Sequence, residues 1–131
     1  MDVICLDANV LFSASYSTRT NIRQLWDLPD TELVAARYAV EEAARNLRSE
    51  PQRAAFSLQM RTVRVVDYPR FTSLPVDLEL VEKDRPILLA AIHAHASHLL
   101  TGDFKHFGHL YGKRISGVLV LPPAEYLRSR G

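Results

Sequence analysis

The amino-acid sequence predicts an α/β protein, a three-layer α/β/α sandwich around a central, mainly parallel sheet. Short apolar runs alternate along the chain with segments whose apolar residues recur every three or four positions. These patterns are typical of buried strands and amphipathic helices, respectively. Strands separated by helices favour right-handed crossovers, which make neighbouring strands parallel and place helices over the sheet. The length of 131 residues fits one domain over 1–131.

The first part of the chain contains a predicted strand and two helical segments. Val3–Leu6 is an apolar run bounded by two aspartates, which indicates a buried strand. Apolar residues at helical spacing follow over 10–14 and again over 22–26. Leu33–Ala36 is either a short strand or the lead-in to the next helix.

The middle of the chain predicts two helices and a strand. Apolar residues at i, i+3, i+4 and i+7 indicate an amphipathic helix over 38–49. Pro51 ends it and begins another helix through Met60, because proline fits the first turn. Val63–Val66 is β-branched at three of its four positions and indicates a strand, while Tyr68–Pro75 holds two prolines and is expected to be a loop.

The last part of the chain repeats this alternation. Asp84-Arg85-Pro86 is typical of a helix start, with an acid near the positive end of the helix and proline in its first turn. That helix is expected to run over Ile87–Ala96. The remaining predicted elements are a strand over His98–Thr101, a turn at Gly102-Asp103, a strand over Val118–Leu121 and a last helix over Ala124–Arg128.

Four acidic residues occupy positions where this fold would bind a ligand. Asp7 directly follows the first predicted strand, and Asp103 comes two residues after the strand that ends at Thr101. Parallel sheets bind ligands beyond the carboxyl ends of their strands, so both acids should face the same rim. Asp84 begins the helix that leads into that strand, and Glu42 lies beside the apolar stripe of an earlier helix.

Four carboxylates gathered in one crevice repel one another unless protons or cations neutralise them. Oxygen ligands select hard divalent ions such as Mg²⁺ or Mn²⁺, and such ions activate water and neutralise charge on a phosphodiester. Together the acids therefore predict a metal-dependent nuclease. Each also has a structural interpretation: Asp84 as a helix cap, Gly102-Asp103 as an ordinary turn, and Glu42 as a solvated helix residue.

Four segments resemble the motifs of PIN-domain ribonucleases, in the order that the family has them. They are Val3–Leu11, with Asp7 and Asn9 after a strand; Tyr38–Ala43, with a helical Glu; Asp84–Ala91, an acid heading an Ala-rich helix; and Leu99–Phe107, a strand followed by Thr-Gly-Asp and ending in His-Phe. The resemblance implies a sandwich whose acidic crevice holds Mg²⁺ or Mn²⁺ through Asp7, Glu42, Asp84 and Asp103. It also implies that Asn9 and Thr101 support these ligands by hydrogen bonds.

The activity implied by this resemblance is that of a metal-dependent endoribonuclease, which hydrolyses RNA phosphodiester bonds to 5′-phosphate and 3′-hydroxyl ends. Many bacterial members of this size are VapC-like toxins, so the resemblance implies a cognate antitoxin as partner, and we further expect a homodimer. Glu42 is chosen over the adjacent Glu41 because Ala43 follows it, as in the family pattern. Phe107 stands where some relatives have a further acid, which predicts one tight and one weak ion.

Basic residues near the expected rim could bind RNA phosphates through sequence-independent contacts. They are Arg85, Lys105, Lys113 and Arg114, together with His106, which lies three residues beyond Asp103. Ordinary surface charge is the alternative interpretation for the Lys and Arg residues. The apolar face formed by Ile22, Leu25 and Trp26 is interpreted as core packing, with a groove for an antitoxin helix as the alternative.

Two other function classes stay open at this stage. One is a non-catalytic PIN-like binding module, against which the four acids argue. The other is a phosphatase or phosphoacceptor on a doubly wound sheet, with Asp7 as the nucleophile. A dehalogenase-like site of that kind needs a second acid two residues later, where Asn9 stands.

Composition excludes several further classes. Cys5 is the only cysteine, which rules out an intrachain disulfide and a cysteine-based zinc site. The formal net charge of +1 lacks the strong basic excess of a dedicated nucleic-acid-binding domain. The longest apolar run, Ile87–Ile92, is far shorter than the roughly 20 residues of a membrane span. The first residues of the chain carry an acid where a secretion signal has a basic residue. We therefore expect a cytoplasmic protein without a membrane partner.

Overall fold

One sheet of six strands lies at the centre of the residues described by this computed structural model, which are 1–16, 21–68, 74 and 78–130. The strands are β1 (Asp2–Leu6), β2 (Thr31–Ala36), β3 (Val63–Val66), β4 (His98–Leu100), β5 (Arg114–Ile115) and β6 (Val118–Leu121). Their order in the sheet is β3-β2-β1-β4-β6-β5, and neighbours pair in parallel except for β5 with β6. The predicted mainly parallel sheet is therefore confirmed.

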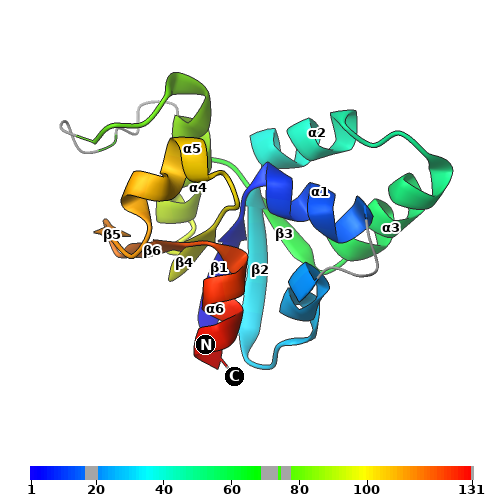
Figure 1. Ribbon diagram of the computed structural model, residues 1–131, viewed down its shortest axis with the longest axis horizontal. Coiled ribbons are helices and arrows are strands. Elements are labelled where there is room, and N and C mark those ends of the chain that lie inside the picture. The colour runs from blue at the N-terminus through cyan, green and yellow to red at the C-terminus, as the bar shows by residue number, and fades with distance from the viewer. Residues whose placement is uncertain (17–20, 69–73, 75–77, 131) are drawn as a thin grey trace.

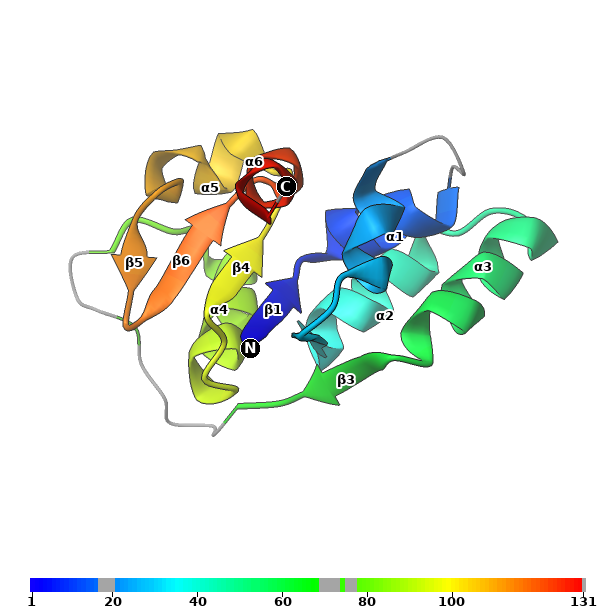
Figure 2. The ribbon, with the colours of Figure 1, turned by 90° about the horizontal axis from the view of Figure 1, so that it is seen from below.

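Helices connect the strands and cover the sheet on both sides (Figures 1 and 2). The described α-helices are α1 (Ala8–Tyr16), α2 (Arg37–Arg45), α3 (Glu50–Met60), α4 (Arg85–His93), α5 (Phe104–Phe107) and α6 (Pro123–Arg130). Short 3₁₀ helices are η1 (Asn21–Asp27), η2 (Glu82–Asp84) and η3 (Gly108–Leu110). Helix α6 and η1 lie on one face and α4 on the other, while α1 packs against α2 and α3. The result is the predicted three-layer α/β/α sandwich.

The middle strands β1 and β4 are buried on both faces. Ile4, Cys5 and Leu6 are inaccessible to solvent, as are Leu99 and Leu100. A parallel sheet covered by helices on both faces requires such continuous apolar strands. Leu6 lies opposite Leu100 in the register, so β1 and β4 end side by side. This register determines where the residues that follow each strand are placed.

Local signals position α3 and β3 where the sequence predicts them. The Ser49 hydroxyl accepts a hydrogen bond from the Gln52 N–H at 3.3 Å, and Pro51 stands in the first turn of α3. Both features favour a helix start, because they satisfy or avoid the unpaired N–H groups of the first turn. Strand β3 has the bounds expected from its β-branched residues, Val63–Val66.

Several helices differ from their predicted bounds. The helix predicted over 38–49 ends at Arg45, and the one predicted over 87–96 spans Arg85–His93. His95 adopts a left-handed backbone with φ of 55°, which is incompatible with continuing α4. The segment over 22–26 is 3₁₀ rather than α-helical, and its apolar face packs against the core, with Leu25 fully buried, as the core interpretation predicts.

Helix α5 and strand β5 were not predicted from the sequence. Asp103, predicted to lie in a turn, is the N-cap of the short helix α5. Strand β5 pairs with β6 in antiparallel orientation at the edge of the sheet. The predicted Tyr68–Pro75 loop lies mostly outside the described residues. Across the described parts of the chain, no helix has the length and apolar character needed to span a bilayer.

Candidate metal centre

The candidate site forms where strands β1 and β4 end. Because Leu6 pairs with Leu100, Asp7 and Thr101 follow neighbouring strand ends, and the Asp7 N–H donates to the Leu100 carbonyl at 3.1 Å. Asp103 stands two residues beyond Thr101, at the N-terminus of α5. This is the edge at which parallel sheets generally bind ligands.

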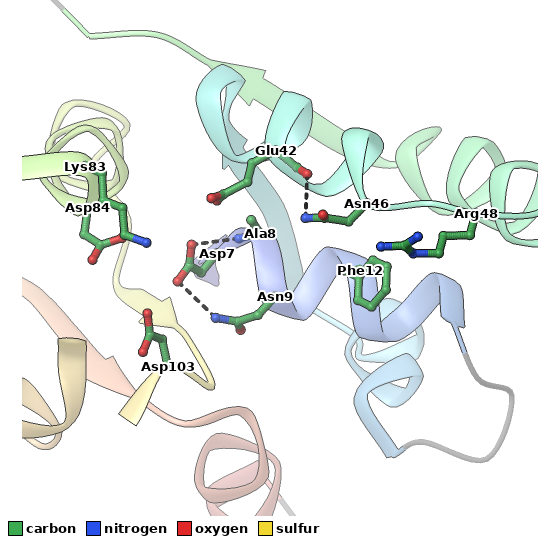
Figure 3. A pocket seen from close by; sticks show the side chains of 10 residues that line it. All are labelled: Asp7, Ala8, Asn9, Phe12, Glu42, Asn46, Arg48, Lys83, Asp84 and Asp103. Carbon is green, nitrogen blue, oxygen red and sulfur yellow. Dashed lines mark hydrogen bonds between the residues drawn. The ribbon is translucent and has the colours of Figure 1, made fainter. Parts of the chain in front are cut away.

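All four acids predicted from the sequence line one cavity of about 420 Å³ (Figure 3). Asp7 follows β1, Glu42 lies in α2, Asp84 precedes α4 and Asp103 precedes α5. The other lining residues are Ala8, Asn9, Phe12, Asn46, Arg48 and Lys83. The adjacent Glu41 lines a different cavity, so Glu42 is the glutamate that joins the three aspartates.

Asp7 is held at the floor of this cavity by hydrogen bonds to both carboxylate oxygens. Its side chain is almost buried, with the residue 5% exposed. Oδ1 accepts from the Ala8 N–H at 2.7 Å, while Oδ2 accepts from the Thr101 hydroxyl at 2.7 Å and from the Asn9 amide at 3.3 Å. Asn9 also accepts from the Gly102 N–H at 2.9 Å. Asn9 and Thr101 thus fix the orientation of Asp7, the type of support that the resemblance implies.

The cavity raises the pKa of its buried acids. Burial raises the pKa of Asp7 to about 6, against the hydrogen bonds from Thr101 and Ala8, and the negative charges of Asp84 and Glu42 raise it further. Burial also raises the pKa of Asp84, which the nearby His106 lowers in part. The folded chain therefore disfavours the accumulation of negative charge here unless a cation neutralises it.

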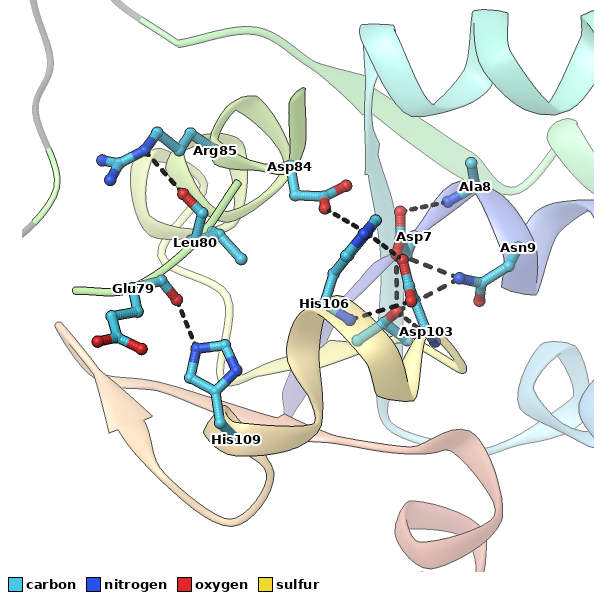
Figure 4. A network of polar contacts seen from close by, with 11 residues as sticks. Asp7, Ala8, Asn9, Glu79, Leu80, Asp84, Arg85, Asp103, His106 and His109 are labelled. Carbon is cyan, nitrogen blue, oxygen red and sulfur yellow. Dashed lines mark hydrogen bonds and ion pairs between the residues drawn. The ribbon is translucent and has the colours of Figure 1, made fainter. Parts of the chain in front are cut away.

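His106 lies between two of the acids, which the sequence did not predict (Figure 4). Its Nδ1 is 2.9 Å from Asp84 Oδ2 and 2.9 Å from Asp103 Oδ2, and its side chain is 21% exposed. Asp84 precedes α4 but makes no capping hydrogen bond with the described backbone. Its carboxylate is directed instead toward the acidic cluster, which argues against the interpretation of Asp84 as a simple helix cap.

The basic residues of the site only partly match the predicted set. Lys83 and Arg48 line the cavity; Lys83 adjoins Asp84 in sequence, whereas nothing in the sequence pattern marks Arg48. The Arg85 guanidinium donates to two backbone carbonyls of the preceding segment at 3.2 and 3.4 Å. Lys105 is exposed on α5. RNA contacts by Arg85, Lys105 and His106 stay predictions.

The donor set of this cavity fits a divalent cation. Asp84, Asp103 and His106 each offer a ligand atom, and these three atoms lie within 4.8 Å of one another. Asp84 Oδ2 is buried, has no hydrogen-bond partner among the described residues and meets His106 Nδ1 at ion-pair distance. A buried carboxylate is unfavourable without a counter-charge. Carboxylate oxygens are the donors that Mg²⁺ and Mn²⁺ prefer.

Comparison with known proteins identifies the same fold in solved structures. A chain of VapBC2 from Rickettsia felis, solved bound to a DNA fragment from their promoter, matches with a TM-score of 0.69 at 15% identity over 92% of this chain and 98% of that chain. A chain of VapBC-1 from nontypeable Haemophilus influenzae matches with a TM-score of 0.59 at 18% identity, covering 93% and 98%. A chain of FitAB bound to an IR36 DNA fragment gives 0.53 at 19% identity, covering 92% and 94%.

These likenesses show that the chain shares its fold with chains of the VapBC and FitAB complexes, and they agree with the α/β/α sandwich expected from the sequence. No protein-family model matches the chain, and no curated protein matches it in sequence.

Proposed function

We propose that this chain is a metal-dependent endoribonuclease that hydrolyses RNA phosphodiester bonds, and that it is the toxin of a toxin–antitoxin pair. The observation that carries the proposal is the convergence of Asp7, Glu42, Asp84 and Asp103 on one cavity. They come from four segments far apart in sequence, as a shared ligand would require. The likeness of the fold to chains of the VapBC and FitAB complexes supports the toxin assignment.

In this proposal, the four acids hold Mg²⁺ or Mn²⁺. When bound, the ion supplies an activated water and neutralises charge on the phosphodiester. Thr101 and Asn9 keep the Asp7 carboxylate in one orientation through their hydrogen bonds to Oδ2. The ammonium of Lys83 and the guanidinium of Arg48, both at the cavity wall, bind non-bridging phosphate oxygens and keep the RNA backbone beside the acids.

The partners follow from the same proposal. RNA is the substrate, with Lys105 and Arg85 as further contacts outside the cavity. A cognate antitoxin holds the enzyme inactive, and the active form is a homodimer. Because VapBC2 and FitAB were solved on DNA fragments, a complex of this chain with its antitoxin is expected to bind its own promoter.

The alternative in which Asp7 acts as a nucleophile is disfavoured by the geometry of Asp7. A nucleophilic carboxylate needs an oxygen that can reach its substrate. Here the Asp7 carboxylate is almost buried, and both of its oxygens accept hydrogen bonds. This arrangement leaves room for a small ion in the cavity that Asp7 lines, but not for attack on a bulky phosphate group. No described feature favours the non-catalytic binding module over the nuclease.

Cleavage of a mixed RNA pool tests the proposal. We expect cleavage with Mn²⁺ or Mg²⁺, none with EDTA, and loss of about a thousandfold or more in rate in Asp103→Asn, because a neutral amide is a weak ligand while it can still cap α5. Glu41→Gln is the matched control, since Glu41 adjoins Glu42 but lines another cavity. Undiminished cleavage by Asp103→Asn, or cleavage in EDTA, would contradict the proposal.

A further inference from the structure

The imidazole of His106 occupies a position in the acidic cluster that hydrogen bonding does not explain. Nδ1 approaches Asp84 Oδ2 and Asp103 Oδ2 equally, at 2.9 Å each (Figure 4). Both Nδ1 and Asp84 Oδ2 are buried, and neither has a hydrogen-bond partner among the described residues. A ring nitrogen has a single lone pair or N–H direction in the ring plane, and here it makes a hydrogen bond to neither carboxylate, so both approaches are ion-pair contacts.

The backbone fixes His106 in this position. Asp103 is the N-cap of α5, and its Oδ1 accepts from the His106 N–H at 3.2 Å. The same helical turn therefore brings the Asp103 carboxylate and the His106 ring onto one side. Buried Phe107 follows directly and anchors α5 in the core. The ring is thus positioned by the backbone of α5 as well as by its contacts with the two carboxylates.

The spacing of these atoms suits the ligands of a common cation. Neighbouring ligands of an octahedral ion at about 2.1 Å are about 3 Å apart, and opposite ligands about 4.2 Å apart. Nδ1 lies 2.9 Å from each carboxylate oxygen, and all three atoms lie within 4.8 Å of one another. Nδ1 thus meets both carboxylates at ion-pair distance, and the same spacing is that of neighbouring ligands around one ion.

We propose that His106 Nδ1 is a direct ligand of the ion held by this site, beside Asp84 and Asp103. This inference rests on the proposed function for the location of the metal, and it adds a nitrogen to a donor set expected to consist of oxygens alone. Imidazole binds first-row transition ions well, whereas Mg²⁺ requires oxygen ligands. His106 therefore makes the site selective for a transition ion such as Mn²⁺ over Mg²⁺, rather than serving as a phosphate contact.

Metal binding to the full chain tests this inference without an activity assay. Titration calorimetry should give an affinity for Mn²⁺ that falls by about tenfold or more in His106→Asn. The affinity for Mg²⁺ should fall less, because Mg²⁺ prefers oxygen ligands, so the ratio of the Mn²⁺ affinity to the Mg²⁺ affinity should fall. His93→Asn is the control, because His93 is exposed at the end of α4, away from the cavity. An unchanged ratio in a folded His106→Asn chain overturns the inference.

Pulsed electron paramagnetic resonance of Mn²⁺ bound to the unaltered chain gives a second readout that does not depend on the variant's folding. We expect nitrogen coupling from a directly bound imidazole, and its absence overturns the inference. The outcomes also separate the two proposals. Nitrogen coupling without RNA cleavage would support His106 as a ligand and refute the nuclease. RNA cleavage without nitrogen coupling would support the nuclease and refute His106 as a ligand.

Discussion

Raising the pH in the absence of divalent ions is expected to destabilise this chain relative to its Asp7→Asn variant. Asp7 has a pKa of about 6 in the folded chain, above its ordinary value of 3.8, because burial disfavours the carboxylate. At pH values between 3.8 and about 6, Asp7 is ionised in the unfolded chain but keeps its proton in the folded chain. The Asp7 contribution to the free energy of unfolding therefore falls as the pH rises from about 4 to about 6, and above that the loss is complete.

The magnitude follows from the size of the pKa shift. The pKa rises from 3.8 to about 6, and a difference of one in pKa corresponds to about 1.36 kcal/mol. Asp7 of the unfolded chain is already partly ionised at pH 4, so the free energy of unfolding of the unaltered chain, minus that of Asp7→Asn, should fall by about 2–3 kcal/mol between pH 4 and 7.5. For a chain of this length, that is a relative change in Tm of about 10 °C.

Thermal and urea unfolding of both proteins in EDTA, at several pH values, measures this difference. Asp7→Asn also disturbs the hydrogen bonds from Thr101 and Asn9. That effect is nearly independent of pH, so it changes the difference in free energy of unfolding by the same amount at every pH. Other titrating groups, such as the half-buried His98, contribute to both proteins and cancel. A difference that stays flat between pH 4 and 7.5 would refute the electrostatic reasoning. At pH 7.5, Mn²⁺ at a hundred times its Kd should restore about 2.7 kcal/mol in the unaltered chain only.

Three further substitutions give distinct expectations. Thr101→Val removes the donor to Asp7 Oδ2 and the acceptor of the Asp103 N–H. We expect the free energy of unfolding in urea to fall by about 1–3 kcal/mol and the metal affinity measured by calorimetry to fall by about 10–100-fold. An unchanged metal affinity would contradict this expectation. Tyr126→Phe removes the 2.6 Å hydrogen bond to the Asp2 carboxylate and should lower the free energy of unfolding by about 1.5 kcal/mol. NMR titration should show that the pKa of Asp2 rises, because this hydrogen bond lowers it. An unchanged pKa of Asp2 would contradict the expectation. Ser49→Ala removes the cap of α3 and should cost about 1 kcal/mol, whereas Ser49→Asp should restore stability.

The sequence predicts those parts of the fold that burial determines. Val3–Leu6 and Val63–Val66 must be strands because short apolar or β-branched runs find partners in a covered sheet. The two residues of β5 carry no such pattern, since a period of two cannot be recognised over so short a segment. Helix α5 likewise depends on the Asp103 cap rather than on an apolar stripe.

The candidate site was predictable where position along the chain decides it. Asp7 and Asp103 follow strand ends, and that alone places them at the rim. The choice between Glu41 and Glu42 depends on how α2 is rotated: Ala39 and Ala43 are fully buried, and Glu41 lies about 160° from each of them on the helix, whereas Glu42 lies at the flank. His106 lies near Asp103 because it stands three residues later in the same turn. The approach of His106 to Asp84 and of Arg48 to the cavity depends on tertiary packing, which no local pattern reveals.

Strand β5 limits how this protein can assemble with other chains. It offers only two residues for pairing, Arg114 is exposed, and the adjoining turn holds Ser116 and Gly117 in left-handed conformations. A short edge strand with an exposed charged residue disfavours pairing with another β-strand and so protects the sheet from edge-to-edge aggregation. A second copy or an inhibitory partner is therefore expected to engage the helical layers or the β3 margin, and not to lengthen the sheet at β5.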